Sequence, residues 1–149
     1  MNGEDKRVFI DTNILIYANY SDSVLKDQAR SKIIWYLQND YELWISRQVI
    51  REFLVYITRF NFENEKLSST ELLNSVFNNL DQYNIAEDSN ITTQKLRYLI
   101  EKYELSGKKI HDANIVATMQ EYNITKLLTH NIKDFERFIN IIEIIALIE

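Results

Sequence analysis

Short apolar runs alternate along this chain with longer segments in which apolar residues recur every three or four positions. The short runs predict buried strands at RVFI (7–10), ELWI (42–45), NIA (84–86) and KLLT (126–129), with a last strand inside INIIEIIAL (139–147). The helical spacing predicts helices over residues 22–39, 46–61, 68–83, 91–105 and 111–122. Strands that are apolar without polar alternation, and that alternate with helices, indicate a parallel sheet covered on both faces. The predicted fold class is therefore α/β.

Few residues interrupt this pattern. The chain has no proline and only two glycines, Gly3 and Gly107, so short connections between its elements are expected. It contains neither an internal repeat nor a linker, and 149 residues suit one domain that buries about 70% of the surface of the unfolded chain. We therefore expect a single domain over residues 1–149.

The composition is that of an ordinary globular protein, with 46% hydrophobic and 26% charged residues. No apolar run approaches the roughly 18 residues that a membrane span needs, and the opening segment MNGEDKR fits neither a signal peptide nor a transit peptide. The absence of cysteine excludes disulfides and thiolate metal sites, and it suits a reducing cytoplasm. A cytoplasmic protein without a membrane partner is the expectation.

The balance of charge limits how such a protein could bind a nucleic acid. Lys and Arg total 17 against 22 Asp and Glu, for a formal net charge of -5. This balance argues against binding RNA or DNA through a uniformly basic surface. A function directed at phosphate would need another source of positive charge, and a divalent cation held by clustered carboxylates could provide it.

Three polar side chains, Asp11, Thr12 and Asn13, directly follow the first predicted strand in the segment VFIDTNILIY. In open α/β sheets, ligands bind outside the carboxyl ends of the strands, at the point where the strand order reverses. Asp11 stands at such a strand end and is therefore a candidate site residue. The alternative is a structural role as the N-cap of a following helix, since all three residue types cap helices well.

Two further acids lie near the starts of predicted helices. Glu52 falls about 60° from Val49 and about 40° from Tyr56 on a helical wheel, at the border of the apolar stripe, from which it could reach a cleft. Asp112 lies in the first turn of its helix, where the helix dipole favours an acid. The structural alternatives are a solvated glutamate paired with an arginine and an acid that only complements the dipole. His111 is a candidate ligand or proton carrier, or else a cap or surface residue.

The segment LLTHNIKDFERF places Thr129, His130, Asn131 and Asp134 after another apolar strand, where capping of a turn is the structural alternative. Taken together, two strand ends and two helix starts present an acid or an amide toward one edge of the sheet. Converging carboxylates repel one another and raise each other's pKa, so they persist only with a compensating cation. A donor set made only of oxygen atoms selects Mg²⁺ or Mn²⁺ over zinc.

Four segments in this order resemble the motifs of the PIN-domain ribonucleases, and most of all those of the VapC-type toxins of prokaryotic toxin–antitoxin pairs. The segments are DTN after the first strand, SRQVIRE, HDANIVA and THNIKDF. The resemblance extends over nearly the whole chain, from about residue 8 to residue 145. Each motif alone is weak, whereas four in sequence are fairly specific.

Carried over to this chain, the resemblance implies an acidic metal site and a set of polar groups that support it. The catalytic and metal-binding carboxylates would be those of Asp11, Glu52, Asp112 and Asp134. The supporting residues would be Thr12, Asn13, Ser46, Thr129 and Asn131. Many family members have an acid where this chain has Asn131, so either Asp134 or Asn131 occupies the fourth ligand position.

The resemblance also implies a three-layer α/β/α sandwich, Mg²⁺ or Mn²⁺ as cofactor, RNA as substrate, a homodimer, and a cognate antitoxin protein that blocks the site. The corresponding chemistry is hydrolysis of a phosphodiester by a metal-activated water, with one ion or two. Basic residues beside the motifs are candidate phosphate contacts or, equally, solvated surface: Arg47, Arg51, Lys108, Lys109 and Lys133. The predicted helices 22–39 and 46–61 are the expected partner-binding elements, because together they expose more aromatic surface than one small sheet requires.

Other functions fit these residues less well. The main alternative is a PIN-like module that binds RNA or a protein without catalysis, and its sign would be the loss of one acid. A phosphoacceptor receiver domain needs paired acids after the first strand and a lysine after the last, and this chain has neither. A haloacid-dehalogenase phosphatase needs D-x-D where this chain has DTN, and a nucleotide-binding Rossmann protein needs a glycine-rich first turn. The favoured function is a metal-dependent endoribonuclease.

Overall fold

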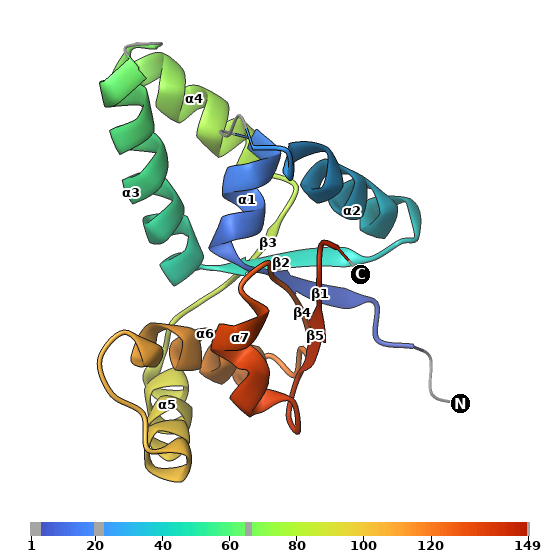
Figure 1. Cartoon of the computed structure of the whole chain (residues 1–149), viewed down its shortest axis with the longest axis vertical. Coiled ribbons are helices and arrows are strands. Elements are labelled where there is room, and N and C mark those ends of the chain that lie inside the picture. Colours follow the sequence, from blue (N-terminus) through green and yellow to red (C-terminus); the bar gives the residue numbers. More distant parts are fainter. Residues whose placement is uncertain (1–3, 20–22, 65–66, 149) are drawn as a thin grey trace.

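Five parallel strands form one sheet through the middle of the molecule in the computed structural model, which describes residues 4–19, 23–64 and 67–148 (Figure 1). The strands are β1 (Arg7–Ile10), β2 (Glu42–Ser46), β3 (Asn84–Ala86), β4 (Lys126–Leu128) and β5 (Glu143–Ile145). Their order is β3-β2-β1-β4-β5, and Phe9 of β1 is in register with Trp44 of β2 and Leu127 of β4. β1 is therefore the central strand, which explains why Phe9 is fully buried.

The helices lie in two layers, one on each face of the sheet (Figure 1). One layer holds α1 (Thr12–Asn19), α2 (Lys26–Gln38), α3 (Arg47–Asn64) and α4 (Ser69–Leu80). The other holds α5 (Asn90–Tyr103), α6 (Lys109–Glu121) and α7 (Ile132–Phe135), which a 3₁₀ turn at Glu136–Phe138 follows. Right-handed crossovers produce the two layers, because the chain adds strands in one direction from β1 to β3 and in the other direction from β4 to β5. The predicted α/β class and the three-layer sandwich are confirmed.

The apolar core fills the space between the sheet and both helix layers. α3 contributes the fully buried Phe53 and Ile57, which lie one helical turn apart. α6 is buried around much of its circumference, and its Ala113 and Ala117 let the helix approach its neighbours closely. This packing fixes the first turn of α6, which carries Asp112. Within the described ranges, no helix is long and apolar enough to cross a lipid bilayer.

Two helices lie where the sequence pattern predicts none. α1 begins directly after β1, because the apolar run ILIYA continues the hydrophobic pattern of the strand and conceals the change to helical geometry. α7 has only four residues, too few for a helical period to show. The other elements lie within a few residues of their predicted ranges, although the helix predicted over 22–39 begins at Lys26, and residues 20–22 lie outside the described part. Gly107, with a φ of 62°, turns the chain between α5 and α6.

Candidate active site

The carboxyl ends of β1 and β4 lie side by side at the point where the strand order reverses. From β1 the chain adds β2 and β3 on one side of the sheet, and then β4 and β5 on the other. The backbone N–H of Asp11 donates to Leu128 O at 3.0 Å, and that of Thr129 donates to the neighbouring strand at 3.1 Å. Such a reversal point is where open α/β sheets bind ligands. Asp11 and Thr129 therefore stand at the edge where the sequence predicts a site.

Asp11 is buried, with 6% of its surface exposed, yet both of its carboxylate oxygens accept hydrogen bonds. Oδ1 accepts from the backbone N–H of Thr12 at 2.8 Å. Oδ2 accepts from the Thr129 hydroxyl at 2.8 Å and from the side-chain amide of Asn13 at 3.0 Å. Donors from three residues hold the carboxylate in one orientation.

Asn13 connects the start of α1 to the loop that follows β4. Its amide nitrogen also donates to Thr129 Oγ1 at 3.3 Å, and its Oδ1 accepts from the backbone N–H of His130 at 3.0 Å. Thr129 Oγ1 in turn accepts from the backbone N–H of Asn131 at 3.0 Å. The structure thus joins the polar residues around Asp11 in one network, in which Asn131 takes part through its backbone.

The four candidate carboxylates act on one another electrostatically. Burial raises the pKa of Asp11 to about 6 against the effect of its hydrogen bonds, and the charge of Glu52 adds to the rise. Burial likewise raises the pKa of Asp112 to about 7, with further contributions from the charges of Asp134, Asp11 and Glu52 in that order. Arg137 lowers the pKa of Asp112. The end of β1 and the helices α3, α6 and α7 therefore bring these four acids into one electrostatic field.

The four acids differ in exposure. Asp11 is buried, Glu52 and Asp112 are partly buried, and Asp134 is exposed. The charge of Asp134 is nevertheless the largest electrostatic contribution from any residue to the raised pKa of Asp112. Asn131 is also exposed, and its side chain makes no cap bond to α7. Of the two candidates for the fourth position, Asp134 is thus the one whose charge acts on Asp112.

The sequence profile of the PIN domain matches residues 8–139. This chain belongs to the PIN-domain family. The matched range begins inside β1 and ends after the 3₁₀ turn that follows α7, so it contains all four acids. No curated protein sequence matches the chain.

Solved structures that share this PIN fold include toxin–antitoxin proteins. VapBC2 from Rickettsia felis, bound to a DNA fragment from its promoter, has 22% identity and a TM-score of 0.68, covering 94% of this chain and 98% of that chain. A toxin–antitoxin complex from Klebsiella pneumoniae has 23% identity and a TM-score of 0.66, covering 95% and 98%. VapC20 from Mycobacterium tuberculosis, a toxin that cleaves the sarcin–ricin loop, has 14% identity and a TM-score of 0.56, covering 80% and 86%. At these identities the likeness shows a common fold.

The PIN motifs contain two further residues of interest, Ser46 and His111, which differ in burial. Ser46 is buried at the end of β2, where its Oγ accepts from the backbone N–H of Val49 at 3.2 Å. This bond caps the start of α3, the helix that carries Glu52. His111 is an exposed residue in the first turn of α6.

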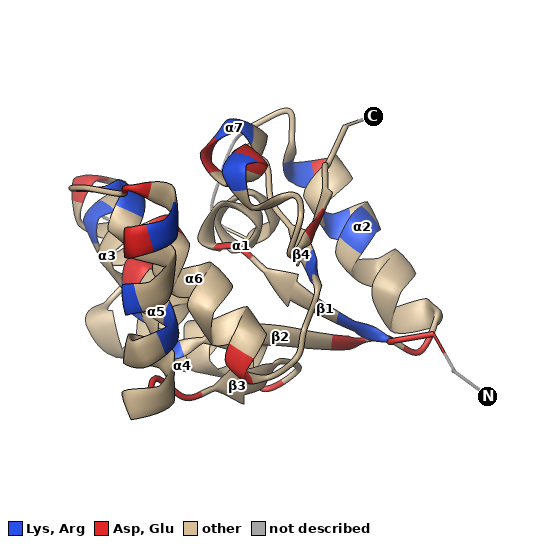
Figure 2. Cartoon of the chain, turned by 90° about the horizontal axis from the view of Figure 1, so that it is seen from below, with Lys and Arg blue, Asp and Glu red and all other residues tan. Residues whose placement is uncertain are grey.

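Basic residues near the PIN motifs do not gather into one face of a single sign. Figure 2 shows Lys and Arg beside Asp and Glu along α5 and α7. Arg47, one of the candidate phosphate contacts, donates to Glu87 at 2.7 and 3.0 Å in a two-bond ion pair. The mixed surface agrees with the net charge of -5 and leaves the attraction of phosphate to another source of positive charge.

Two features of the PIN site suit a divalent cation. Burial and the neighbouring carboxylates raise the pKa of Asp112, and the buried Thr12 hydroxyl beside Asp11 has no hydrogen-bond partner among the described residues. Within residues 4–19, 23–64 and 67–148, however, no three Asp, Glu or His side chains are close enough to hold one ion together. Mg²⁺ typically keeps several waters and uses one or two carboxylates directly, so it does not need three acids in contact with it. The donor set therefore fits a hydrated Mg²⁺ or Mn²⁺.

Two residues at this PIN site have no role assigned to them in the prediction from sequence, although Gln48 lies inside the motif SRQVIRE. Gln48 is buried, and its side-chain amide donates to Glu52 Oε1 at 3.0 Å. Arg137, from the 3₁₀ turn, is the positive charge that lowers the pKa of Asp112. The available signals are spacings, because Gln48 precedes Glu52 by one helical turn and Arg137 follows Asp134 by three residues.

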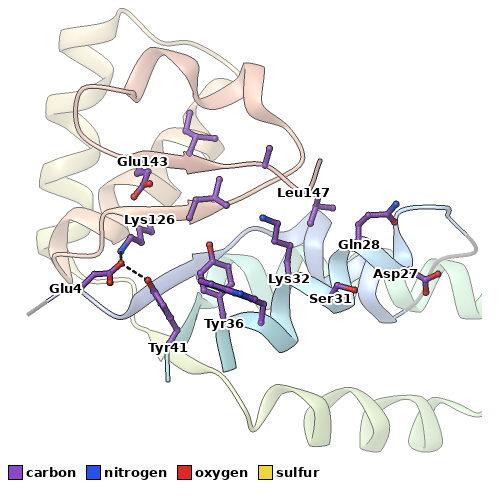
Figure 3. A pocket seen from close by; sticks show the side chains of 14 residues that line it. Glu4, Asp27, Gln28, Ser31, Lys32, Tyr36, Tyr41, Lys126, Glu143 and Leu147 are labelled. Atoms are coloured by element: carbon purple, nitrogen blue, oxygen red, sulfur yellow. Dashed lines mark hydrogen bonds and ion pairs between the residues drawn. The ribbon is translucent and has the colours of Figure 1, made fainter. Parts of the chain in front are cut away.

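A groove of about 1050 Å³ lies apart from the four acids, between α2 and the β5 segment (Figure 3). Trp35, Tyr36 and Tyr41 are among the side chains that line it. Its polar groups bond to one another, since Glu4 Oε1 accepts from the Tyr41 hydroxyl at 2.9 Å and from Lys126 Nζ at 3.4 Å (Figure 3). None of the four acids lines this groove, so it is separate from the candidate active site.

Proposed function

We propose that this protein is a metal-dependent endoribonuclease and the toxin of a VapBC-type toxin–antitoxin pair. The observation that carries the proposal is the electrostatic coupling of four acids at the reversal point of the sheet: Asp11, Glu52, Asp112 and Asp134. In two of them, Asp11 and Asp112, burial and the charges of neighbouring acids raise the pKa, which is typical of functional sites. Their oxygen donors suit Mg²⁺ or Mn²⁺, and such an ion supplies the positive charge that the surface lacks.

The residues of the chain prepare this site for hydrolysis. When bound, a divalent cation supplies a water of lowered pKa, oriented for in-line attack on a phosphodiester, and screens the charge of the phosphoryl oxygens. Asp11 offers a carboxylate of fixed orientation, because donors hold both of its oxygens. Asp112, with a pKa of about 7, holds a proton for part of the time at neutral pH and releases it when a cation binds. Glu52 and Asp134 complete the donor set from opposite helix layers.

The same proposal names RNA as the substrate and a cognate antitoxin as a partner, with a homodimer as the working form. Support comes from the solved relatives, which include toxin–antitoxin complexes and a toxin that cleaves the sarcin–ricin loop. α2 and α3 supply suitable partner surfaces, because α2 exposes Ile34, Trp35 and Leu37, and α3 exposes Val55 and Phe62. Exposed apolar surface of this kind is typical of protein interfaces.

The second candidate function is a PIN-like module that binds RNA or a protein without catalysis. The observation in its favour is that, in the part of the chain the structure describes, no three acidic or histidine side chains come within reach of one ion. The two functions differ in whether a divalent cation makes the protein cleave RNA.

The deciding experiment is incubation of the purified protein with a mixed cellular RNA pool in Mg²⁺, Mn²⁺ or EDTA. The Asp11→Asn variant removes one carboxylate at nearly constant size. Asp81→Asn is the matched control, because Asp81 is exposed at the end of α4. We expect cleavage by the parent and by Asp81→Asn in Mg²⁺ or Mn²⁺, none in EDTA, and almost none by Asp11→Asn. Equal cleavage by Asp11→Asn and the parent would exclude the proposed site.

A further inference from the structure

Gln48 has an unusual set of bonds for a glutamine in the first turn of a helix. It is buried, with 6% of its surface exposed. Its side-chain nitrogen donates to Glu52 Oε1 at 3.0 Å and to the backbone carbonyl of His111 at 2.8 Å. Its Oε1 accepts from the side-chain amide of Asn114 at 2.8 Å. Both N–H groups of the amide and its oxygen are therefore engaged.

These bonds join the two helix layers at the carboxyl end of the sheet. Gln48 belongs to α3, whereas His111 and Asn114 belong to α6, and the two helices lie on opposite sides of the sheet in Figure 1. The carbonyl of His111 is part of the peptide bond that leads into Asp112, and Asn114 follows two residues later. One side chain thus holds the α6 backbone just before Asp112 and the α6 side chain just after it.

The orientation of the Gln48 amide follows from its partners. Glu52 Oε1 and the His111 carbonyl are acceptors, and the Asn114 side-chain nitrogen is a donor. With the amide reversed, its oxygen would face two oxygens and its nitrogen would face an amide donor, which leaves all three bonds unmade. Only the observed orientation satisfies all of these groups.

We propose that Gln48 is a positioning residue that sets the distance between Glu52 and Asp112 and thereby prepares the two acids to share a divalent cation. The inference rests on the proposed acidic metal site and extends it to a residue that is not itself a ligand. Groups that hold metal ligands from behind commonly change metal affinity by about 10- to 100-fold when removed. Gln48 holds one ligand candidate, Glu52, directly and the other, Asp112, through its backbone neighbours.

The chemistry of Gln48 explains why another residue of similar size would not serve. Methionine fills much the same volume but donates nothing, so Glu52 Oε1, the His111 carbonyl and the Asn114 amide would each lose a partner. Glutamate would keep the acceptor for Asn114 but would place a second negative charge one helical turn from Glu52. A primary amide of this length is the group that bonds to all three.

The experiment measures Mn²⁺ binding by isothermal titration calorimetry to the parent, Gln48→Met and Asn114→Ala. We expect the dissociation constant to rise about 10- to 100-fold in Gln48→Met. A smaller rise is expected in Asn114→Ala, which removes one bond of the bridge and leaves the two donors of Gln48 in place. Val76→Ala, a truncation in the buried face of α4, lowers stability without touching the bridge and should bind Mn²⁺ like the parent. Unchanged affinity in Gln48→Met would overturn the inference.

A second measurement separates this inference from the proposed function. The chain contains no cysteine, so nitroxide labels attach selectively at Arg59→Cys on α3 and Lys108→Cys before α6, both at exposed positions. Pulsed electron spin resonance then reports the α3 to α6 distance without any metal. We expect a narrow distribution in the parent background and a broader or shifted one with Gln48→Met added. If the parent binds no Mn²⁺, the proposed metal site fails. An unchanged distance distribution overturns the positioning role whatever the metal result.

Discussion

Replacing Asp11 by Asn should make the metal-free protein more stable at neutral pH, although it removes the central acid of the site. Burial is the largest cause of the raised pKa of Asp11, from 3.8 to about 6. The folded state therefore holds this proton more tightly than the unfolded state, so stability falls as the pH rises from about 4 to about 6, and the full cost of the ionised carboxylate is present above about pH 6. The difference of about 2 pH units corresponds to about 3 kcal/mol at pH 7.5.

Asp11→Asn loses part of this gain in stability through a lost hydrogen bond. Asn presents one N–H pair where Asp11 Oδ2 accepts from Thr129 and Asn13, so one of those bonds is lost at a cost of about 1 kcal/mol. The net effect is about 2 kcal/mol of added stability in EDTA at pH 7.5. For a chain of this length it raises Tm by about 4–8 °C.

Thermal unfolding followed by circular dichroism measures this effect in EDTA at pH 7.5 and at pH 4.5. At pH 4.5 the folded parent carries a protonated Asp11, and the remaining linkage cost of about 1 kcal/mol is offset by the hydrogen bond that Asn loses, so the advantage of Asp11→Asn should fall to near zero. Saturating Mn²⁺ should reverse the order, because ligand at about 100 times its dissociation constant stabilises the parent by about 2.7 kcal/mol. Asp81→Asn should match the parent throughout. A lower Tm for Asp11→Asn than for the parent in EDTA at pH 7.5 would refute the reasoning.

Two further changes test the surroundings of the acids. Thr129→Val keeps the shape of the side chain but removes the hydroxyl that donates to Asp11 and accepts from the backbone N–H of Asn131. Urea unfolding at pH 7.5 should show that the free energy of unfolding falls by about 1–3 kcal/mol. An unchanged unfolding midpoint would contradict the hydrogen-bond network. Arg137→Met removes the positive charge that lowers the pKa of Asp112. The acidic limb of the pH dependence of RNA cleavage should then move to higher pH, and a profile identical to that of the parent would show that Arg137 does not act on the site.

The fold was largely predictable, because the strands and the longer helices carry their own periodicity. Phe9 and its neighbours in β1 are apolar without alternation, as a strand covered on both faces requires, and Phe53 and Ile57 mark the inner face of α3 at helical spacing. α1 escaped prediction because its residues ILIYA extend the apolar run of β1 without a break. Only the tertiary structure shows that the chain changes to a helix at Thr12.

The candidate site, like the fold, was only partly predictable from the sequence. Asp11 and Asp112 could be proposed because the end of a strand and the first turn of a helix are local features that a sequence reveals. Gln48 lies in the motif SRQVIRE, but its role could not be proposed, because its partners His111 and Asn114 lie 63 and 66 residues further along the chain, in the other helix layer. The residues next to Gln48 in the sequence do not indicate its bonds to α6. The contribution of Arg137 likewise depends on how the 3₁₀ turn packs beside α6.

The most direct test of the acidic metal site is anomalous X-ray diffraction from crystals of the protein soaked in Mn²⁺. The expected result is a strong anomalous peak at the carboxyl ends of β1 and β4, in direct contact with an oxygen of Asp11 and with one or more oxygens of Glu52, Asp112 and Asp134. The Asp11→Asn variant, soaked in the same way, should show a much weaker peak. Full Mn²⁺ occupancy elsewhere, with none among these four acids, would contradict the account.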